Sequence, residues 1–247
     1  MGDSKYCYPE TDILINKLDI REHRKLFEAE KELTFIRLQE LQSEPIRGNF
    51  DFAHLLTIHK YIFQDIYEWA GKIRTVEIGK GNLFCLTEYI QEFGNALFKK
   101  FFTQCYSAKD NRDRFVVMLA ENYGDLNALH PFREGNGRAQ REFARCLCLA
   151  CGYGFDLSCT THEEMLNASI ISFDKGDNSY FEKIFSRAIY SYKDRPADEN
   201  PNRLRILSAD DLVIGTYSEY GYNDSSDYAY YKNKYESMIR EMKNMSD

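Results

Sequence analysis

The sequence predicts an all-α protein that carries one inserted β-hairpin. Most of the first 195 residues place apolar side chains at helical periods among charged ones, with short Gly, Pro, Asn and Asp stretches between. Residues 72–86 instead alternate apolar and polar side chains around two glycines. After about residue 195 the sequence becomes polar and rich in tyrosine. We therefore predict a domain over residues 1–195, with an N-terminal helical extension, and a candidate regulatory appendage over 196–247.

The helices follow one another along this domain. The first, residues 21–43, repeats leucine and isoleucine at helical spacing. Asp51 is a suitable N-cap for the second, which we expect to run to Gly71. Five further helices are predicted, over residues 87–107, 112–129, 136–151, 162–174 and 179–193.

The hairpin lies between the second and third helices. Val76 and Ile78 alternate with polar residues, and Gly79 and Gly81 provide the turn. Two short arms around a glycine-rich turn are typical of a β-hairpin. It is the only stretch with strand character in the predicted helical domain.

The composition excludes several classes of protein. Hydrophobic residues make up 43% of the chain, enough for a packed core, and the net charge of −7 argues against a nucleic-acid coat. The sequence begins without the apolar region of a signal peptide, and no run reaches the roughly 18 apolar residues of a membrane helix. Seven cysteines in this context are typical of reduced thiols. We expect a cytoplasmic protein that binds neither nucleic acid nor membrane.

Two groups of metal-binding residue types are interpreted as core. Cys146, Cys148 and Cys151 alternate with leucines in CLCLAC, whereas a structural zinc site needs four ligands. Cysteine in such a helix behaves as a small apolar side chain. His54 and His59 are five residues apart, which does not place them on one helix face.

The stretch ALHPFREGNGRAQREF, residues 128–143, combines features of an anion-binding site. Gly135, Asn136 and Gly137 allow consecutive backbone N–H groups to converge, and they open a helix whose N-terminus carries partial positive charge. Arg138 and Arg141 are three residues apart and offer planar forks suited to phosphate oxygens. This much positive potential indicates a polyphosphate ligand.

The same loop carries candidates for the chemistry. Glu134 would repel phosphates unless a cation lay between them, so its presence predicts Mg²⁺ held by one carboxylate and the substrate phosphates. His130, at the end of the preceding helix, can take a proton from a hydroxyl near pH 7. The Asn136 amide can donate to a phosphoryl oxygen, and Phe132 is expected to anchor the loop in the core.

HPFREGNGRAQR resembles the signature of the Fic family, His-Pro-Phe-x-Asp/Glu-Gly-Asn-Gly-Arg-x-x-Arg, at every defining position. IHKYIFQDIYEWAGKIRTV and YCYPETDILINKL also resemble family sequences, so the resemblance covers roughly residues 5–193. It implies the Fic fold, a helical bundle with an inserted hairpin called the flap. It also implies an enzyme, a protein adenylyltransferase that moves AMP from ATP to a Tyr, Ser or Thr hydroxyl of a target protein and releases pyrophosphate.

Carried over by position, the resemblance gives each motif residue a role. His130 would be the general base, and Glu134 would hold Mg²⁺. Residues 135–137 would cradle the phosphates, and the β/γ end of ATP would be bound by Arg138 and Arg141.

Alternatives remain open for the transferred group. Relatives of the Doc type, which resemble phosphotransferases, carry lysine at the position of Gly137, so glycine there favours AMP transfer. The motif does not decide against transfer of UMP, GMP, phosphate or phosphocholine, or against removal of AMP. A non-catalytic peptide-binding module would be expected to have lost His130 or Arg138. A nucleic-acid-binding helical protein is disfavoured by the acidic charge.

The resemblance also implies how a target would be held. The flap would bind an extended target segment by strand addition. Its expected members are Thr75, Val76, Glu77, Ile78, Gly79, Lys80, Gly81 and Asn82. Tyr217, Tyr220 and Tyr222 in the appendage are candidates for self-modification, with a packing or dimer surface as the alternative.

Regulation and location are the last expectations from the resemblance. Many family members carry an inhibitory helix, Ser/Thr-x-x-x-Glu-Gly/Asn, whose glutamate pairs with the second arginine of the motif. Ser237 and Glu241 have this spacing, although Met242 replaces Gly/Asn. Otherwise an antitoxin-like chain could inhibit a bacterial toxin-like enzyme, or no inhibition exists. The oligomeric state is open, and the cytoplasmic location would change for an effector delivered into a host cell.

Overall fold

The computed structural model describes residues 5–80, 82–191, 218–220, 236–237 and 239–244. The helices in these ranges are α1 (His23–Ser43), α2 (Phe52–Phe63), α3 (Ile90–Ser107), α4 (Arg112–Leu129), α5 (Asn136–Ala150), α6 (His162–Lys175), α7 (Ser179–Ala188) and the short 3-10 helix η1 (Leu157–Cys159). Residues 236–237 and 239–244 are also helical. The prediction of an all-α protein with one inserted hairpin is confirmed.

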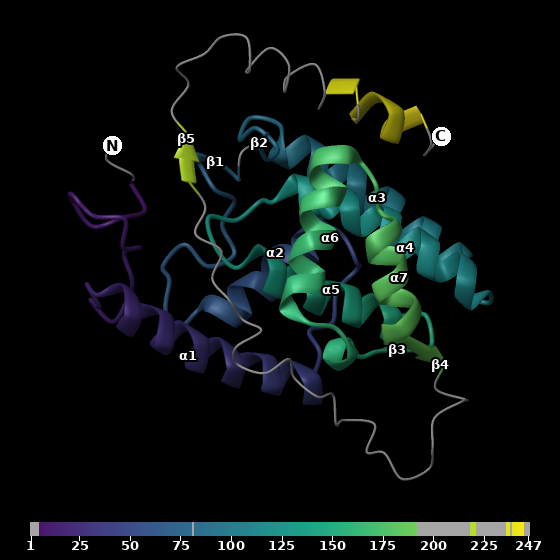
Figure 1. Cartoon of the computed structure of the whole chain (residues 1–247), viewed down its shortest axis with the longest axis horizontal. Coiled ribbons are helices and arrows are strands. Elements are labelled where there is room, and N and C mark those ends of the chain that lie inside the picture. Colours follow the sequence, from purple (N-terminus) through teal and green to yellow (C-terminus); the bar gives the residue numbers. More distant parts are fainter. Residues whose placement is uncertain (1–4, 81, 192–217, 221–235, 238, 245–247) are drawn as a thin grey trace.

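Helix α5 forms the centre of the bundle (Figure 1). It packs against α2 and α4, and α1 packs along α2 on the outside. Phe143 of α5 is fully buried and contacts the rings of Phe98 and Phe101 from α3. The segment that leads into α5 is therefore held in the interior, where neighbouring helices can position it.

Helix α2 is shorter than predicted. Its N-cap is Asp51 as expected, because the Asp51 carboxylate accepts a hydrogen bond from the backbone N–H of His54 at 2.8 Å. The helix ends at Phe63, and the chain then turns back until the Gly71 N–H donates to His59 Nδ1 at 2.9 Å. A continuous helix would separate these two residues by roughly 18 Å, at 1.5 Å per residue. The positive φ of Gly71, 77°, allows the turn.

Two small sheets complete the described fold. Strands β1 (Glu77–Lys80) and β2 (Asn82–Leu83) form the predicted hairpin, and β5 (Ser218–Tyr220) pairs antiparallel with the other edge of β1. Strands β3 (Tyr153–Phe155) and β4 (Ile189–Ser191) pair with each other. The last predicted helix therefore ends at Ala188 and not at residue 193, because the next three residues join a sheet. Three-residue strands are too short to produce a readable alternation.

The C-terminal helical residues lie beside the start of α3 (Figure 1). Ile239 and Met242 are buried in the core cluster. Tyr89 donates to the Glu236 carboxylate at 3.2 Å, and Lys243 pairs with Glu92 at 2.6 Å. The predicted domain boundary after residue 195 lies outside the described residues.

The cysteine-rich end of α5 belongs to the core. Cys146, Cys148 and Cys151 are all buried. Burial raises the pKa of each of these three thiols. In the described parts of the chain no three His, Cys, Asp or Glu side chains are grouped to hold a metal ion. The same parts contain no helix that is long and apolar enough to cross a membrane.

Candidate active site

His130 forms the C-cap of α4 in a left-handed conformation, with φ 40° and ψ 61°. Its Nδ1 lies 2.9 Å from the Asn127 carbonyl oxygen. Because a carbonyl can only accept, Nδ1 carries the proton and Nε2 is the basic nitrogen. The ring stacks on Phe84, with 3.7 Å between the ring centroids and 11° between the planes. The structure thus gives His130 the tautomer and the fixed orientation that a general base needs.

Arg74 connects the His130 loop to the hairpin, and sequence reasoning missed it. This arginine is 1% exposed. Its Nε donates to the His130 carbonyl at 2.9 Å, and its other nitrogens donate to the carbonyls of Val76 and Cys85. The Arg74 backbone N–H also donates to the Pro131 carbonyl at 2.8 Å. A single buried side chain therefore sets the position of the hairpin relative to the candidate base.

Glu77 extends this connection within the hairpin. Its carboxylate lies 3.4 Å from Arg74 and accepts from the Thr87 backbone N–H at 2.9 Å and hydroxyl at 2.6 Å. Glu77 is buried, so it lies on the inner side of the hairpin and joins the start of β1 to the chain that follows β2. At the other end of the hairpin, the Asn82 amide donates to Asp174 of α6 at 2.9 Å.

Glu134 is buried in the loop before α5. Its Oε1 accepts from the Gly135 N–H at 2.8 Å and lies 3.5 Å from Nη2 of Arg138. Burial, and then the charge of Glu30, raise the pKa of Glu134 to about 7, while Arg138 opposes the shift. A cation would stabilise the ionised carboxylate here, so the donor chemistry fits Mg²⁺ held by one carboxylate together with phosphates.

Glu30 of α1 reaches the same place from the far side and was not predicted. It is 0% exposed. Its carboxylate pairs with Nη2 of Arg138 at 2.5 Å and accepts a hydrogen bond from the Tyr67 hydroxyl. Thr34, one turn further along α1, accepts from Nη1 of Arg138 at 3.2 Å. The sequence contained a signal for this position, since Glu30 and Thr34 follow Leu26 at a four-residue spacing and therefore share its buried helix face.

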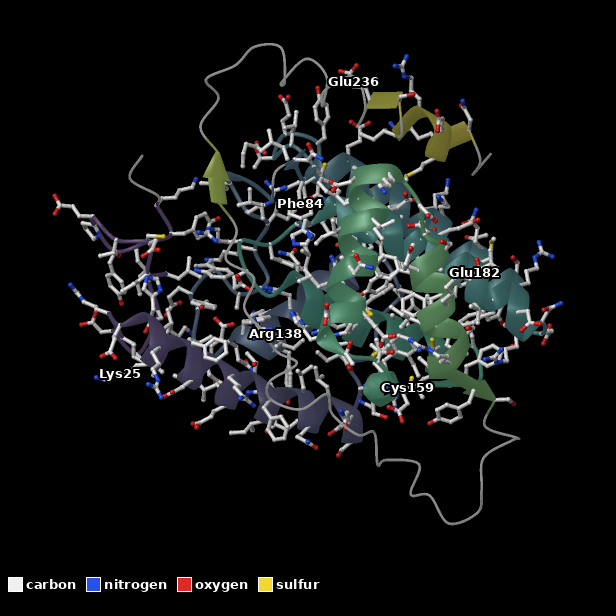
Figure 2. The ribbon with its side chains drawn as sticks, in the orientation of Figure 1. Lys25, Phe84, Arg138, Cys159, Glu182 and Glu236 are labelled. Carbon is white, nitrogen blue, oxygen red and sulfur yellow. The ribbon has the colours of Figure 1, made fainter. Side chains whose placement is uncertain are left out.

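Arg138 therefore differs from the sequence interpretation. We expected its guanidinium to bind the β/γ phosphates, but it is 5% exposed and points to α1 (Figure 2). Besides its partners Glu30 and Thr34, it lies over the Phe63 ring with 4.5 Å from Cζ to the centroid. A buried guanidinium that is paired and stacked holds two helices together. In this structure Arg138 joins α5 to α1, and its contact with phosphates stays a prediction.

The Asn136 side chain bonds within the loop. Its Oδ1 accepts from the Phe132 N–H at 2.9 Å, and its Nδ2 donates to the Phe132 carbonyl at 2.7 Å. The side chain is fully buried and closes the loop, and its contact with a phosphoryl oxygen stays a prediction. Phe132 is buried as predicted and stacks on His59 with 3.7 Å between centroids.

His59 supports the loop from α2. Its Nε2 donates to the Glu134 carbonyl at 3.0 Å while its Nδ1 accepts from Gly71. Burial lowers the pKa of His59 to about 3, so the ring is neutral and makes both bonds at physiological pH. The other histidine of α2, His54, places its Nε2 2.9 Å from the Ile46 carbonyl oxygen.

The anion-binding features remain at the start of α5. Gly135 has φ 80°, and a Cβ there would lie 2.0 Å from a Phe63 ring carbon, so glycine is required on both counts. The first-turn N–H groups that follow have no acceptor within their helix. Arg141 is half-buried, and its Nη1 lies 3.0 Å from the point where a Cβ of Gly137 would sit. The site therefore combines a helix N-terminus with one arginine beside it.

The candidate inhibitory pair lies on an exposed face of the C-terminal helical residues. Ser237 and Glu241 are exposed, and the Ser237 hydroxyl lies 3.3 Å from the Glu241 carboxylate. The helix that carries them faces the core through Ile239 and Met242. Its spacing matched an inhibitory helix, but burial places the pair on the solvent side. In the flap, Gly81 lies outside the described residues, and Thr75 and Val76 precede β1.

Comparison with known proteins agrees with this geometry. Residues 49–148 match the model of the Fic/DOC family. The chain is 37% identical over 190 residues to the "Probable protein adenylyltransferase Fic" of Escherichia coli K12. This alignment covers 76% of this chain and 93% of that protein. It is 38% identical over 169 residues to the "Probable protein adenylyltransferase y4lH" of Sinorhizobium fredii, covering 68% and 86% of the two chains.

Solved structures give the same result for the fold. The N-terminal Fic domain of a cell filamentation protein from Bartonella quintana, with bound ADP, is 31% identical and superposes with a TM-score of 0.71. The alignment covers 75% of this chain and 94% of that domain. BepC from Bartonella tribocorum, a VirB-translocated effector with bound AMPPNP, is 27% identical with a TM-score of 0.70, over 75% and 96% of the two chains.

Proposed function

The chain belongs to the Fic/DOC family, and we propose that it transfers AMP from ATP to a hydroxyl group of a target protein. The observation that carries this proposal is the state of His130. Its Nδ1 proton is committed to the Asn127 carbonyl, which leaves Nε2 as the base, next to a loop that opens into an anion-binding helix start. Relatives named protein adenylyltransferases support the same chemistry.

The reaction follows from these positions. The target oxygen attacks the α-phosphorus of ATP while Nε2 of His130 takes the hydroxyl proton. The bond from the α-phosphorus to the bridging oxygen breaks, and pyrophosphate leaves. The first-turn N–H groups of α5 and the guanidinium of Arg141 would face the charge on the phosphates. Arg138 would act indirectly, by fixing the start of α5 against α1.

Glu134 would hold the magnesium ion. When bound, the ion neutralises charge on the phosphates. The protein's own contribution is to orient Glu134 through the Gly135 N–H and to keep it beside Arg138. Transfer of AMP is supported by glycine at position 137, because relatives of the Doc type, which resemble phosphotransferases, carry lysine there.

The target would be a segment with a Tyr, Ser or Thr hydroxyl held on the hairpin. An inhibitory glutamate on Arg141 would come from an antitoxin-like chain or from Glu241 of the appendage, and the third option is an enzyme without inhibition. The VirB-translocated relatives support the expectation that a member of this kind can also act after delivery into a host cell.

The test compares labelled donors on the purified protein, alone and with a bacterial lysate. We expect protein labelling from α-³²P-ATP with Mg²⁺ and none from γ-³²P-ATP. Labelled UTP, GTP and CDP-choline distinguish UMP, GMP and phosphocholine transfer. Label from γ-³²P-ATP alone would indicate a phosphotransferase. No label from any donor, together with binding of peptides to the hairpin, would favour the non-catalytic module.

A further inference from the structure

The edge of strand β1 is occupied by another part of the same chain. In the hairpin, β1 pairs on one side with β2, with Gly79 opposite Leu83. On its other side it pairs antiparallel with β5, and the partners are Glu77 with residue 220, Ile78 with 219 and Gly79 with 218. The edge of β1 opposite β2 is therefore occupied by β5 from Glu77 to Gly79, in the sheet order β2-β1-β5 (Figure 1).

This strand lies next to the candidate base. Ile78 is 0% exposed and packs in one cluster with Phe84, Ala128 and Phe173. Phe84 in turn stacks on the His130 ring, and Arg74 bonds both the His130 carbonyl and the hairpin backbone. An extended segment that pairs with β1 is thus carried past His130 in a set register. A sheet edge of this kind binds extended peptides through main-chain hydrogen bonds.

A second contact holds the same appendage near the hairpin. The helical residues after 235 bury Ile239 and Met242. Lys243 pairs with Glu92, and Tyr89 bonds Glu236, at the beginning of the helix that follows the hairpin. The appendage is therefore attached on the C-terminal side of β5 as well as through the chain that leads into it. Such a double tether keeps β5 close to β1 at a high effective concentration.

We propose that residues 218–220 are a built-in occupant of the target-binding edge of β1. A target segment must displace them before it can pair with the hairpin, so the appendage sets a threshold for target binding. The partner class is an extended segment of another protein that competes by main-chain pairing. This inference rests on the proposed function only in assuming that the competing segment belongs to a protein to be modified. The occupancy of the edge concerns binding and needs no nucleotide.

The length of the occupant fits this role. Three paired residues provide few main-chain hydrogen bonds, and each is worth little net free energy in water. The strand is held mainly because it belongs to the same chain, since a segment joined to its binding site has an effective concentration that can reach the order of millimolar. A longer target segment can therefore replace it without unfolding the domain.

The experiment uses the full chain with Ser218→Pro, and Ser218→Ala as the matched control. The Ile78 carbonyl accepts from the Phe84 N–H on the β2 side, so Ile78 and residue 219 form a non-hydrogen-bonded pair. The bonds to β5 are made by Gly79 with residue 218 and by Glu77 with residue 220. Proline at 218 removes an N–H that pairs with β1, whereas alanine preserves the backbone. The first readout is amide hydrogen exchange at residues 77 and 79, for which we expect at least about a tenfold faster rate in Ser218→Pro and no change in Ser218→Ala.

The second readout is binding of a fluorescein-labelled synthetic peptide with the sequence of residues 214–224, measured by anisotropy without ATP. We expect at least about tenfold tighter binding to Ser218→Pro than to the wild type or Ser218→Ala, because the tethered competitor is gone. Met242→Asp, which removes the second tether, should strengthen binding in the same direction. Equal peptide affinity in all four proteins, or unprotected amides at 77 and 79 in the wild type, would overturn the proposal. Either result is independent of whether the protein transfers AMP.

Discussion

The two sides of the α5 N-terminus use charged side chains in opposite ways. On the α1 side, Arg138 is 5% exposed and ion-paired with Glu30, which is 0% exposed. The α4 side is made by His130, Gly137 and Arg141, and here the arginine is half-buried. Arg141 is close enough to Tyr123 of α4 to lower the pKa of Tyr123, although burial outweighs this effect and raises that pKa overall. A paired and buried charge fixes position, whereas a partly exposed one can be offered to a ligand. We therefore expect changes on the α1 side to alter stability and changes on the α4 side to alter activity.

The largest effect is expected on the α4 side, for His130→Ala. Removing a general base typically costs between about 10² and 10⁴ in rate, so kcat for AMP transfer should fall by that factor. The melting temperature should change by only a few degrees. His162→Ala, at the start of α6, is the matched control and should keep full activity. Activity above a tenth of wild type in His130→Ala would contradict the assigned base.

The next effect belongs to the α1 side. Glu30→Ala leaves Arg138 buried without its carboxylate, which typically costs about 3–5 kcal/mol of unfolding free energy. Urea unfolding measures it. Glu32→Ala, an exposed position on the same helix, should stay within about 0.5 kcal/mol of wild type. The double variant Glu30→Met/Arg138→Met should recover much of the loss, because it removes both charges together. No recovery would mean that the ion pair contributes stability that two apolar side chains do not replace.

Arg141→Ala sharpens the comparison from the other direction. Loss of charge-assisted hydrogen bonds of about 1.5–3 kcal/mol should lower kcat/KM for ATP by roughly 10–100-fold. The unfolding free energy should remain within about 0.5 kcal/mol of wild type, in contrast to Glu30→Ala. Arg141→Lys should restore part of the activity, because the charge is kept while the planar fork is lost. If Arg141→Ala destabilised the fold as strongly as Glu30→Ala, the two sides would not differ.

The last prediction is a pH dependence and concerns Glu134, which lies between the two sides. Its pKa is raised from 4.5 to about 7, so the folded protein binds more protons than the unfolded chain in this interval. Its contribution therefore makes stability decrease as pH rises from about 4.5 to about 7 and level off above. Urea unfolding at several pH values should show this slope in the wild type, in the absence of Mg²⁺. Glu134→Gln should remove the slope, and an unchanged slope in that variant would assign it to another group.

Much of the site could be predicted from local sequence. The positions of His130, Gly135 and Phe132 follow from the motif and from what a turn into a helix requires, and family membership is confirmed by the comparisons. The hairpin was readable from its alternation and glycines. In these cases the physical cause lies within a few residues of the effect.

The rest depends on partners far away in the chain. The spacing of Arg138 and Arg141 places them near each other on α5, but only the fold decides that one meets α1 and the other lies by α4. Glu30 and Arg138 are 108 residues apart, and the periodicity of neither segment predicts that the two residues pair. The pairing of β5 with β1 joins residues more than a hundred positions apart through three residues that carry no strand pattern.

The left-handed cap at His130 has a consequence for where charge goes during the reaction. It ends an 18-residue helix, and the loop then begins a 15-residue helix, so the carboxyl end of one peptide dipole and the amino end of another lie in one short segment. In the proposed reaction, the proton gained by the imidazole would meet the partial negative end of α4, and pyrophosphate would meet the partial positive end of α5. The cation formed by proton transfer and the anion formed by cleavage of the phosphate bond would each arise where the backbone field favours it. The two helix ends would thus separate charge across the loop before any side chain contributes.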